Sequence, residues 1–537
     1  MPTVAEKLVG TLRDMGIRYV FGIPGGPWIP YMDAMRTGGI EFVLVANEAS
    51  GGIMADVCAR ITGVPGACHG TFGPGATNLS TGVGCAYLDR SPLLAFTSEQ
   101  SDAMLKRTTQ MNIDHQALFA PITKWTTRLT RDTVAETIRK AVQVAMAEVP
   151  GPVHIGVPSD LADMSVPEET TPATLVPHTP SPPDRAVLDK AGELFRKARR
   201  PLLAVGLTAA RMKLTKELAE VVRRHMVPVV LTPMAKGMLP ENHPCYAGVL
   251  FHALSDHVAL TYRDADCVMG IGYDPVEFNY EEWMPDVPLV HLDISPADID
   301  KGYHLACDVV GDLRQSLGYL AKMAQVETAW DLDAVAKNRE MMFESLKPRA
   351  GDFGARAALA VLRELLPQDG IMTCDVGAHT HLIGQQWPTP APGLQIMTNG
   401  WSSMGFGVPA AIAAKLCLPE RTVACVSGDG GFLMMAGEMI TARRLGLNVV
   451  FVVLADSELS LIHVKQERKG YEPYGTRLFN GDLFASDHLF GVPVFTVTDV
   501  GEMREALRKA FSVDGPCIVE AVIDGTEYGE LVARRNK

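Results

Sequence analysis

The sequence predicts an α/β protein built from several parallel sheets with flanking helices. The chain has 537 residues, far more than one hydrophobic core usually holds, so two to four domains are expected. Short apolar runs of strand type alternate with amphipathic runs of helix type along most of the chain. Residues 422–454 read as strand, glycine turn, helix and strand, which is the βαβ unit of parallel sheets.

The first 160 residues alternate the two kinds of signal most clearly. Helices are predicted at residues 4–15, 50–62 and 75–87, and strands at 18–22, 42–46, 66–70 and 92–97. The apolar run Gly151–Pro158 reads as the strand that closes this unit. We therefore expect a first domain over residues 1–165, followed by a proline-rich linker over residues 166–184.

Two further α/β units follow the linker. Four apolar runs separated by helical patterns predict a Rossmann-like middle domain over residues 185–320; they are PLLAVG, VPVVLT, ADCVMGIG and VPLVHLDI. A helical segment, Asp331–Arg349, then leads into a third domain over residues 350–530.

Composition limits the partners and the compartment. The net charge of −13 and the isoelectric point near 5.6 argue against nucleic acid or an anionic membrane as partner. Ten scattered cysteines without a CxxC pair indicate buried free thiols in a reducing compartment. The N-terminal pattern is not that of a signal peptide, and no apolar run reaches transmembrane length. A cytoplasmic protein is expected.

Two aspartates stand at equivalent positions in the βαβ unit. Asp429, in Gly428-Asp429-Gly430-Gly431, follows the first strand, and Asp456 follows the second, 27 residues later (456 − 429). Ligands in such sheets bind at the carboxyl ends of strands. Two carboxylates beside a helix N-terminus suit a hard divalent cation carrying a diphosphate, and the glycines allow close approach of the backbone. A structural turn with two solvated aspartate caps is the alternative.

A third acid stands at a strand end in the first domain. The run Phe42–Ala46 ends at Asn47-Glu48, directly before the predicted helix. From the residues alone Glu48 is either a helix cap or a catalytic carboxylate, and the cap is the simpler interpretation.

These segments resemble known thiamine-diphosphate enzymes. The stretch Cys425–Glu458 resembles the thiamine-diphosphate motif of the 2-oxo acid decarboxylase and acetolactate synthase superfamily, and Glu41–Glu99 resembles the pyrimidine-binding domain of acetolactate synthases. The resemblance covers essentially the whole chain in the family's domain order. It implies the thiamine-diphosphate-binding fold twice, in the N-terminal pyrimidine-binding and C-terminal diphosphate/Mg-binding domains, around a Rossmann-like middle domain.

The resemblance also implies a cofactor site. Asp429 and Asp456 become side-chain ligands of Mg²⁺, with the backbone carbonyl of Glu458 as the third protein ligand. Met404 takes the apolar position that bends the cofactor, although methionine is more often core filler. The Ser402 carbonyl accepts from the aminopyrimidine, and His379, otherwise a surface loop histidine, faces the diphosphate. The implied cofactor-binding residues are Gly377, Ala378, His379, Ser402, Met404, Gly428, Asp429, Gly430, Gly431, Asp456 and Glu458.

Three residues are implied to be catalytic. Glu48 becomes the carboxyl that hydrogen-bonds the aminopyrimidine and activates the cofactor. Gln110 corresponds to an active-site glutamine, although its spacing to Ile122 is one residue longer than the usual pattern. His115 is a candidate proton donor, with a solvated loop histidine as the alternative.

Departures from the family pattern gather on the substrate pocket, whose expected residues are Trp28, Asn47, Leu461, Ile462 and His463. Asn47 stands where the family often has histidine. The loop Pro24–Pro30 lacks a lysine that the catabolic branch usually carries, and Leu459 and His463 replace an aromatic and a small residue. The donor acid is therefore left open between pyruvate and another 2-oxo acid.

The implied reaction is decarboxylation of pyruvate with carboligation to acetolactate, through a cofactor ylide and an enamine. The alternatives are a non-ligating decarboxylase of a larger 2-oxo acid, a flavin-dependent oxidase of the same superfamily and a non-catalytic scaffold. The run Gly270–Phe278 replaces the flavin motif and resembles the catabolic branch, so FAD is not expected. By family analogy the active sites lie between subunits of a homodimer or homotetramer.

Overall fold

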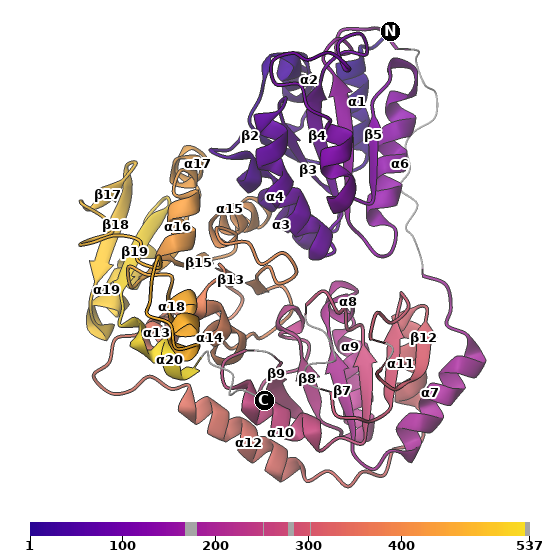
Figure 1. Cartoon of the computed structure of the whole chain (residues 1–537), viewed down its shortest axis with the longest axis vertical. Helices are drawn as coiled ribbons and strands as arrows, with labels where there is room; N and C mark the ends of the chain where they lie inside the picture. The colour runs from indigo at the N-terminus through magenta and orange to yellow at the C-terminus, as the bar shows by residue number, and fades with distance from the viewer. Residues whose placement is uncertain (167–179, 251, 278–283, 301, 532–537) are drawn as a thin grey trace.

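The computed structural model describes residues 1–166, 180–250, 252–277, 284–300 and 302–531. Within these residues the chain forms three separate sheets, seen as three lobes in Figure 1. Each sheet is parallel, apart from one short antiparallel pairing in the third, and helices flank it. The predicted fold class, three domains of parallel sheet with flanking helices, is therefore confirmed.

The first sheet has the strand order β2-β1-β3-β4-β6-β5. Its strands are β1 (Tyr19–Gly22), β2 (Glu41–Leu44), β3 (Gly66–Gly70), β4 (Leu93–Glu99), β5 (Trp125–Arg128) and β6 (Pro152–Pro158). Its helices are α1 (Val4–Asp14), α2 (Ile29–Gly38), α3 (Glu48–Thr62), α4 (Pro74–Leu88), α5 (His115–Phe119) and α6 (Val134–Met146). The elements predicted between residues 4 and 97 are present, with ends shifted by one or two residues.

The second sheet has the order β12-β11-β10-β7-β8-β9. Its strands are β7 (Pro201–Val205), β8 (Val229–Leu231), β9 (Tyr246–Val249), β10 (Cys267–Ile271), β11 (Leu289–Asp293) and β12 (Leu305–Val310). The helices are α7 (Arg185–Lys197), α8 (Leu207–Arg211), α9 (Thr215–His225), α10 (Ser255–Arg263), α11 (Leu313–Lys322) and α12 (Leu332–Ser345), the last leading to the third lobe. Most of the predicted linker, residues 167–179, and Phe278 lie outside the described residues.

The third sheet has the order β14-β13-β15-β16-β19-β18-β17. Its strands are β13 (Ile371–Cys374), β14 (Gln395–Ile396), β15 (Val423–Gly428), β16 (Val449–Ala455), β17 (His488–Leu489), β18 (Val492–Val497) and β19 (Cys517–Val522). Its helices are α13 (Ala355–Leu365), α14 (Ala378–Gln386), α15 (Gly407–Cys417), α16 (Asp429–Met435), α17 (Glu438–Arg444), α18 (Ser460–Arg468), α19 (Val500–Ala510) and α20 (Tyr528–Leu531).

The helix predicted after the glycine turn differs from expectation. It begins at Asp429 and is interrupted at Ala436-Gly437, giving α16 and α17 in place of one helix. Glycine is a poor helix former, and the break places Glu438 at the start of α17. There its buried carboxylate accepts hydrogen bonds from the backbone N–H groups of Ala46 and Asn47, at 2.9 and 3.1 Å. The break therefore places Glu438 where it joins the third lobe to the first.

Other polar contacts hold the lobes together. Arg60 donates to the Met397 carbonyl (2.8 Å), and Arg90 forms an ion pair with Asp274 (2.6 Å). The buried Lys236 donates to the carbonyls of Gly384 and Trp387. Apolar packing of α3 against α15 adds to these contacts between the first and third lobes.

All ten cysteines are free, and nine of them are buried, as predicted. In the part of the chain that the structure describes, no helix is long and apolar enough to cross a membrane.

Candidate functional site

Three aspartates meet at one edge of the third sheet. β13, β15 and β16 are consecutive parallel neighbours, so their carboxyl ends lie side by side. Asp375 follows β13, Asp429 follows β15 and Asp456 follows β16. The predicted pairing of Asp429 with Asp456 at matching strand ends is present in the fold.

Backbone donors hold Asp429 and Asp456 in place. Asp429 is only 2% exposed, and its two oxygens accept from the N–H groups of Gly430 and Ser457, each at 2.7 Å. Asp456 accepts from the Glu458 N–H (3.3 Å) and the Ser460 hydroxyl. Burial and the charge of Asp456 raise the pKa of Asp429 to about 6, and burial raises the pKa of Asp456. A bound cation would relieve this repulsion, so the pair fits a divalent metal.

A buried histidine stands beside the aspartates. The His379 ring lies close to Gly377 and Gly428, since a Cβ added at either glycine would come within 3.5 Å of the ring. His379 is 3% exposed, and its Nε2 has no hydrogen-bond partner. Burial lowers its pKa to about 4, so the ring is neutral near pH 7. It is therefore not the surface histidine considered as an alternative. An unpartnered ring nitrogen here fits a ligand oxygen such as that of a diphosphate.

The remaining predicted cofactor residues surround this edge. Gly428, Gly430 and Gly431 form the turn into α16, and Ala378 is the first residue of α14. The Met404 Cε atom and Leu459 both lie about 3 Å from where a Cβ at Gly430 would stand. Met404 is thus partly buried at the turn, not in the interior. Ser402 is exposed and has a left-handed backbone, with φ of 52°.

Asp375 was not predicted, yet it organises the site. It is fully buried, and one oxygen accepts from the N–H groups of Val376, Gly405 and Phe406, at 2.7, 2.8 and 3.1 Å. Its other oxygen accepts from the Ser427 hydroxyl (2.7 Å). Burial raises its pKa to about 6. Asp375 therefore fixes the loop that carries Met404, Gly405 and Phe406 (the Met404 loop) to the carboxyl ends of β13 and β15. The available signal in the sequence is an acid directly after the apolar run Ile371–Cys374.

Gly431→Ala is expected to damage this arrangement. A Cβ at Gly431 would overlap the Asp375 Oδ2 atom, which cannot withdraw without losing its hydrogen bond. We expect a loss of about 2–4 kcal/mol of unfolding free energy, measured by denaturant unfolding. Gly10→Ala is the control, because that helical position in α1 has open space around it. If the two variants had the same unfolding free energy, the predicted clash between a Cβ at position 431 and Asp375 would be contradicted.

Glu48 lies in the first domain, at the start of α3. Asn47 is the N-cap, and its side chain accepts from the Ala49 N–H. The capping role therefore falls to Asn47. The Glu48 carboxylate is 6% exposed and accepts from the Asn78 amide (3.1 Å). Among the described residues, no hydrogen bond or ion pair joins Glu48 to Asp429, Asp456 or His379.

His115 and Gln110 lie apart from the aspartates. His115 is 3% exposed, and its Nδ1 bonds the Thr97 hydroxyl (2.9 Å), so the solvated-loop alternative is wrong. Burial lowers its pKa to about 4. Thr97 also bonds His154 Nε2 (2.7 Å), which places His115 in a buried network beside β4. Gln110 is exposed in the loop before α5.

The predicted pocket residues divide into two groups. Leu461, Ile462 and His463 lie on the first turn of α18, just after Asp456. His463 lies 2.9 Å from a Glu458 carboxylate oxygen, and this contact raises its pKa. Trp28 is instead fully buried, stacked on His69 with ring centres 4.0 Å apart, and Asn47 is exposed. Trp28 thus belongs to the first lobe's core.

Comparison with known proteins places these features in a family context. Three family models match, described as the N-terminal TPP binding domain (residues 2–118), the central domain (188–320) and the C-terminal TPP binding domain (375–521) of thiamine pyrophosphate enzymes. The chain is 31% identical to an acetolactate synthase large subunit of Parasynechococcus marenigrum, over 96% of this chain and 86% of that protein. It is 30% identical to an acetolactate synthase of Arthrospira platensis, over 98% and 95%. It is 29% identical to a catabolic acetolactate synthase of Raoultella terrigena, over 97% and 95%.

Proposed function

The chain belongs to the acetolactate synthase family of thiamine pyrophosphate enzymes, and we propose that it converts two pyruvates to acetolactate and CO₂. Thiamine diphosphate, when bound, supplies a reactive carbon that adds to the keto group and an electron sink for loss of CO₂. The observation that carries the proposal is the unpartnered, buried Nε2 of His379 beside Asp429 and Asp456. A hydrogen-bond donor and two carboxylates at one sheet edge suit a diphosphate held through a metal.

The residues have separable roles in this proposal. Asp429, Asp456 and the Glu458 carbonyl would hold Mg²⁺, while the Glu458 side chain is already engaged by Thr476 (2.6 Å) and His463. Neutral His379 would donate to a diphosphate oxygen. Met404, beside Gly430, would contact the cofactor rings, and the Ser402 carbonyl would accept from the aminopyrimidine.

Catalytic and substrate contacts would come from other elements. Glu48 is proposed to hold and move the proton at the pyrimidine. Gln110 and His115 are also proposed to take part in catalysis, Gln110 from an exposed loop and His115 from its buried hydrogen-bond network. The first turn of α18 is proposed to line the substrate pocket. Asn47, exposed beside Glu48, is proposed to contribute at its edge, whereas buried Trp28 would act only through packing.

The test is incubation with thiamine diphosphate, Mg²⁺ and pyruvate, following CO₂ and acetolactate together. One acetolactate is expected for each CO₂, because the donor pyruvate loses its carboxyl and the acceptor keeps its own. Released acetaldehyde would instead indicate a non-ligating decarboxylase. Absence of turnover on pyruvate, with turnover of a larger 2-oxo acid, would move the donor specificity to that acid.

We propose that the protein is a homodimer or homotetramer whose sites form between subunits. Exposed apolar side chains lie on α16, which begins at Asp429, and on the following helix α17. Their exposed fractions are 48% for Leu433, 60% for Met434 and 49% for Ile440. Leu44 (42%) is close by, since its carbonyl accepts from Arg444 on α17. Such a patch is typical of a subunit interface. Among the described residues of one chain, Glu48 makes no hydrogen bond or ion pair with these aspartates, which agrees with a site completed by a second chain.

Complementation tests this arrangement. Glu48→Gln and Asp429→Asn chains are each expected to lose at least about 100-fold of their turnover alone. Co-expressed as mixed dimers, they regain one intact site, giving about a quarter of wild-type activity for random pairing. Activity that stays at background, with mixed dimers demonstrated by two affinity tags, would place both residues in one subunit's site.

We propose that the middle domain holds no FAD. The buried Glu277 carboxylate accepts from the N–H groups of Leu207 and Met234, each at 3.0 Å, just after β7 and β8. These donors face the edge where a nucleotide phosphate binds in such sheets, and they are already engaged. The purified protein is expected to lack flavin absorbance in the visible range. A yellow protein would contradict this and favour the oxidase alternative.

We also propose the domain limits expected from the sequence, 1–165, 185–320 and 350–530, with the linker at 166–184. The cytoplasm is the proposed compartment, supported by ten cysteines that are all free.

A further inference from the structure

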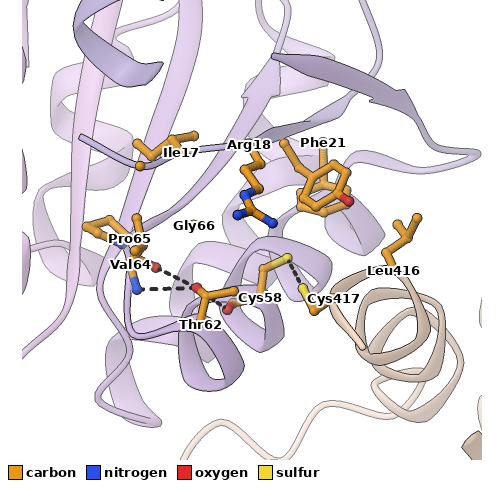
Figure 2. Close-up of a pocket in the computed structure, with 12 residues that line it drawn as sticks. Ile17, Arg18, Phe21, Cys58, Thr62, Val64, Pro65, Gly66, Leu416 and Cys417 are labelled. Carbon is orange, nitrogen blue, oxygen red and sulfur yellow. Dashed lines mark hydrogen bonds between the residues drawn. The ribbon is translucent and has the colours of Figure 1, made fainter. Parts of the chain in front are cut away.

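A pair of cysteines joins the first and third lobes. Cys58 lies in the last turns of α3, and Cys417 is the last residue of α15. Their Sγ atoms are 2.7 Å apart, and Figure 2 shows the two side chains pointing at each other from the two helices. A covalent S–S bond measures about 2.05 Å, so little movement separates the pair from a disulfide.

The pair is accessible from one side. It lines a cavity of about 390 Å³ together with Arg18, Tyr19, Thr62 and Leu416. Cys417 is half-buried, whereas the other nine cysteines are buried. A small oxidant can therefore reach Cys417 before it reaches any other thiol.

The surroundings also favour Cys417 as the nucleophile. The Cys58 hydrogen bond and the Arg18 charge lower the pKa of Cys417. Figure 2 shows the Arg18 guanidinium directed toward the pair. The same hydrogen bond and burial raise the pKa of Cys58. A thiol of lowered pKa at the open position, with a second thiol 2.7 Å away to resolve it, is the arrangement that reacts with peroxides.

We propose that Cys58 and Cys417 form a reversible disulfide that ties the first domain to the third when the protein meets hydrogen peroxide. The Cys417 thiolate attacks one peroxide oxygen and the O–O bond breaks, giving a sulfenic acid and a hydroxide that takes up a proton as water. The Cys58 sulfur then attacks the sulfenic sulfur, the S–O bond breaks, and a second water leaves with the Cys58 proton. Two thiols are oxidised and one peroxide is reduced.

The bond has a clear mechanical consequence. It closes a loop between residues 359 apart in the sequence, which strongly restricts the unfolded chain. It also links α3, which begins at Glu48, to α15, which follows the Met404 loop. The oxidised protein should therefore unfold at a higher temperature, and a thiol reductant should reverse the change.

Peptide mapping tests the bond directly. The full-length protein is treated with hydrogen peroxide, denatured, alkylated and digested with trypsin. The expected product is peptide 37–60 joined to peptide 416–421, sensitive to reductant. The denatured oxidised chain should also run faster on a non-reducing gel, because its loop is closed.

Three variants separate the disulfide from general thiol chemistry. Cys58→Ser and Cys417→Ser should each abolish the joined peptide and the gel shift. Cys307→Ser, in the middle-domain core, should leave both intact. Recovery of both thiols in alkylated form, Cys417 only as sulfinic acid, or a bond between two chains would each overturn the proposal. The joined peptide and the gel shift are measured without any enzyme turnover. This proposal rests on its own observations, so a negative result here would leave the proposed reaction untouched.

Discussion

Glu48→Gln is expected to lower kcat by about 10²- to 10⁴-fold, the range for loss of a positioned proton-transfer group. Glutamine keeps the shape of the side chain, so the Asn78 contact and the packing at 6% exposure are largely preserved. It cannot hold and release a proton at the pyrimidine. The loss should therefore fall on kcat, with thiamine diphosphate binding close to wild type. Steady-state kinetics and a cofactor titration followed by tryptophan fluorescence measure the two effects.

Glu41→Gln is the matched control for this variant. Glu41 is an exposed glutamate on the neighbouring strand β2, so its substitution makes the same chemical change away from the proposed cofactor site. Its kinetics should match wild type. Full turnover by Glu48→Gln would instead remove the proposed role and revive the non-catalytic interpretation.

The features that depend on local pattern were predictable from the sequence. Glycine turns, strand ends and the spacing of Asp429 from Asp456 are local, and neighbouring parallel strands bring them together. The role of Asp375 was missed because it depends on contacts with Gly405, Phe406 and Ser427, which lie 30 to 52 residues away. No periodic pattern reports contacts at that separation.

Burial was the other property that the sequence did not reveal. His115 and Trp28 both follow loop-like residues, which suggested accessible positions. In the fold each ring stacks or bonds inside the first lobe, because Thr97 and His69 come from strands β4 and β3 beside them. The break between α16 and α17 was missed for a related reason, since Glu438 bonds a loop about 390 residues earlier.

Asp429→Asn is expected to remove the stabilisation that Mg²⁺ and thiamine diphosphate give the protein. Asp429 is buried and bonded through both oxygens, so an amide would bring a donor to the Ser457 N–H or the Gly430 N–H in place of an acceptor. We expect turnover to fall at least about 100-fold at limiting cofactor, as for lost metal-site partners. Thermal unfolding with and without Mg²⁺ and cofactor measures the binding. Asp456→Asn, the same change at the second proposed metal ligand, is the comparison, and it should also lose the magnesium-dependent stabilisation.

The pH dependence of the metal-free protein gives an independent check. The pKa of Asp429 is about 6 when folded, above its ordinary value of 3.8, so the folded chain binds the proton more tightly. The unfolding free energy of the protein must then fall as pH rises from 3.8 to about 6, by on the order of 2–3 kcal/mol in total. The amide of the Asp429→Asn variant does not titrate. Its unfolding free energy, measured by denaturant unfolding from pH 4 to 7, should therefore lack this decrease with pH. Mg²⁺ binds the ionised carboxylate, so its affinity for wild type should weaken below about pH 6. An Asp429→Asn protein that keeps both this decrease with pH and the magnesium-dependent stabilisation would show that the metal is held elsewhere.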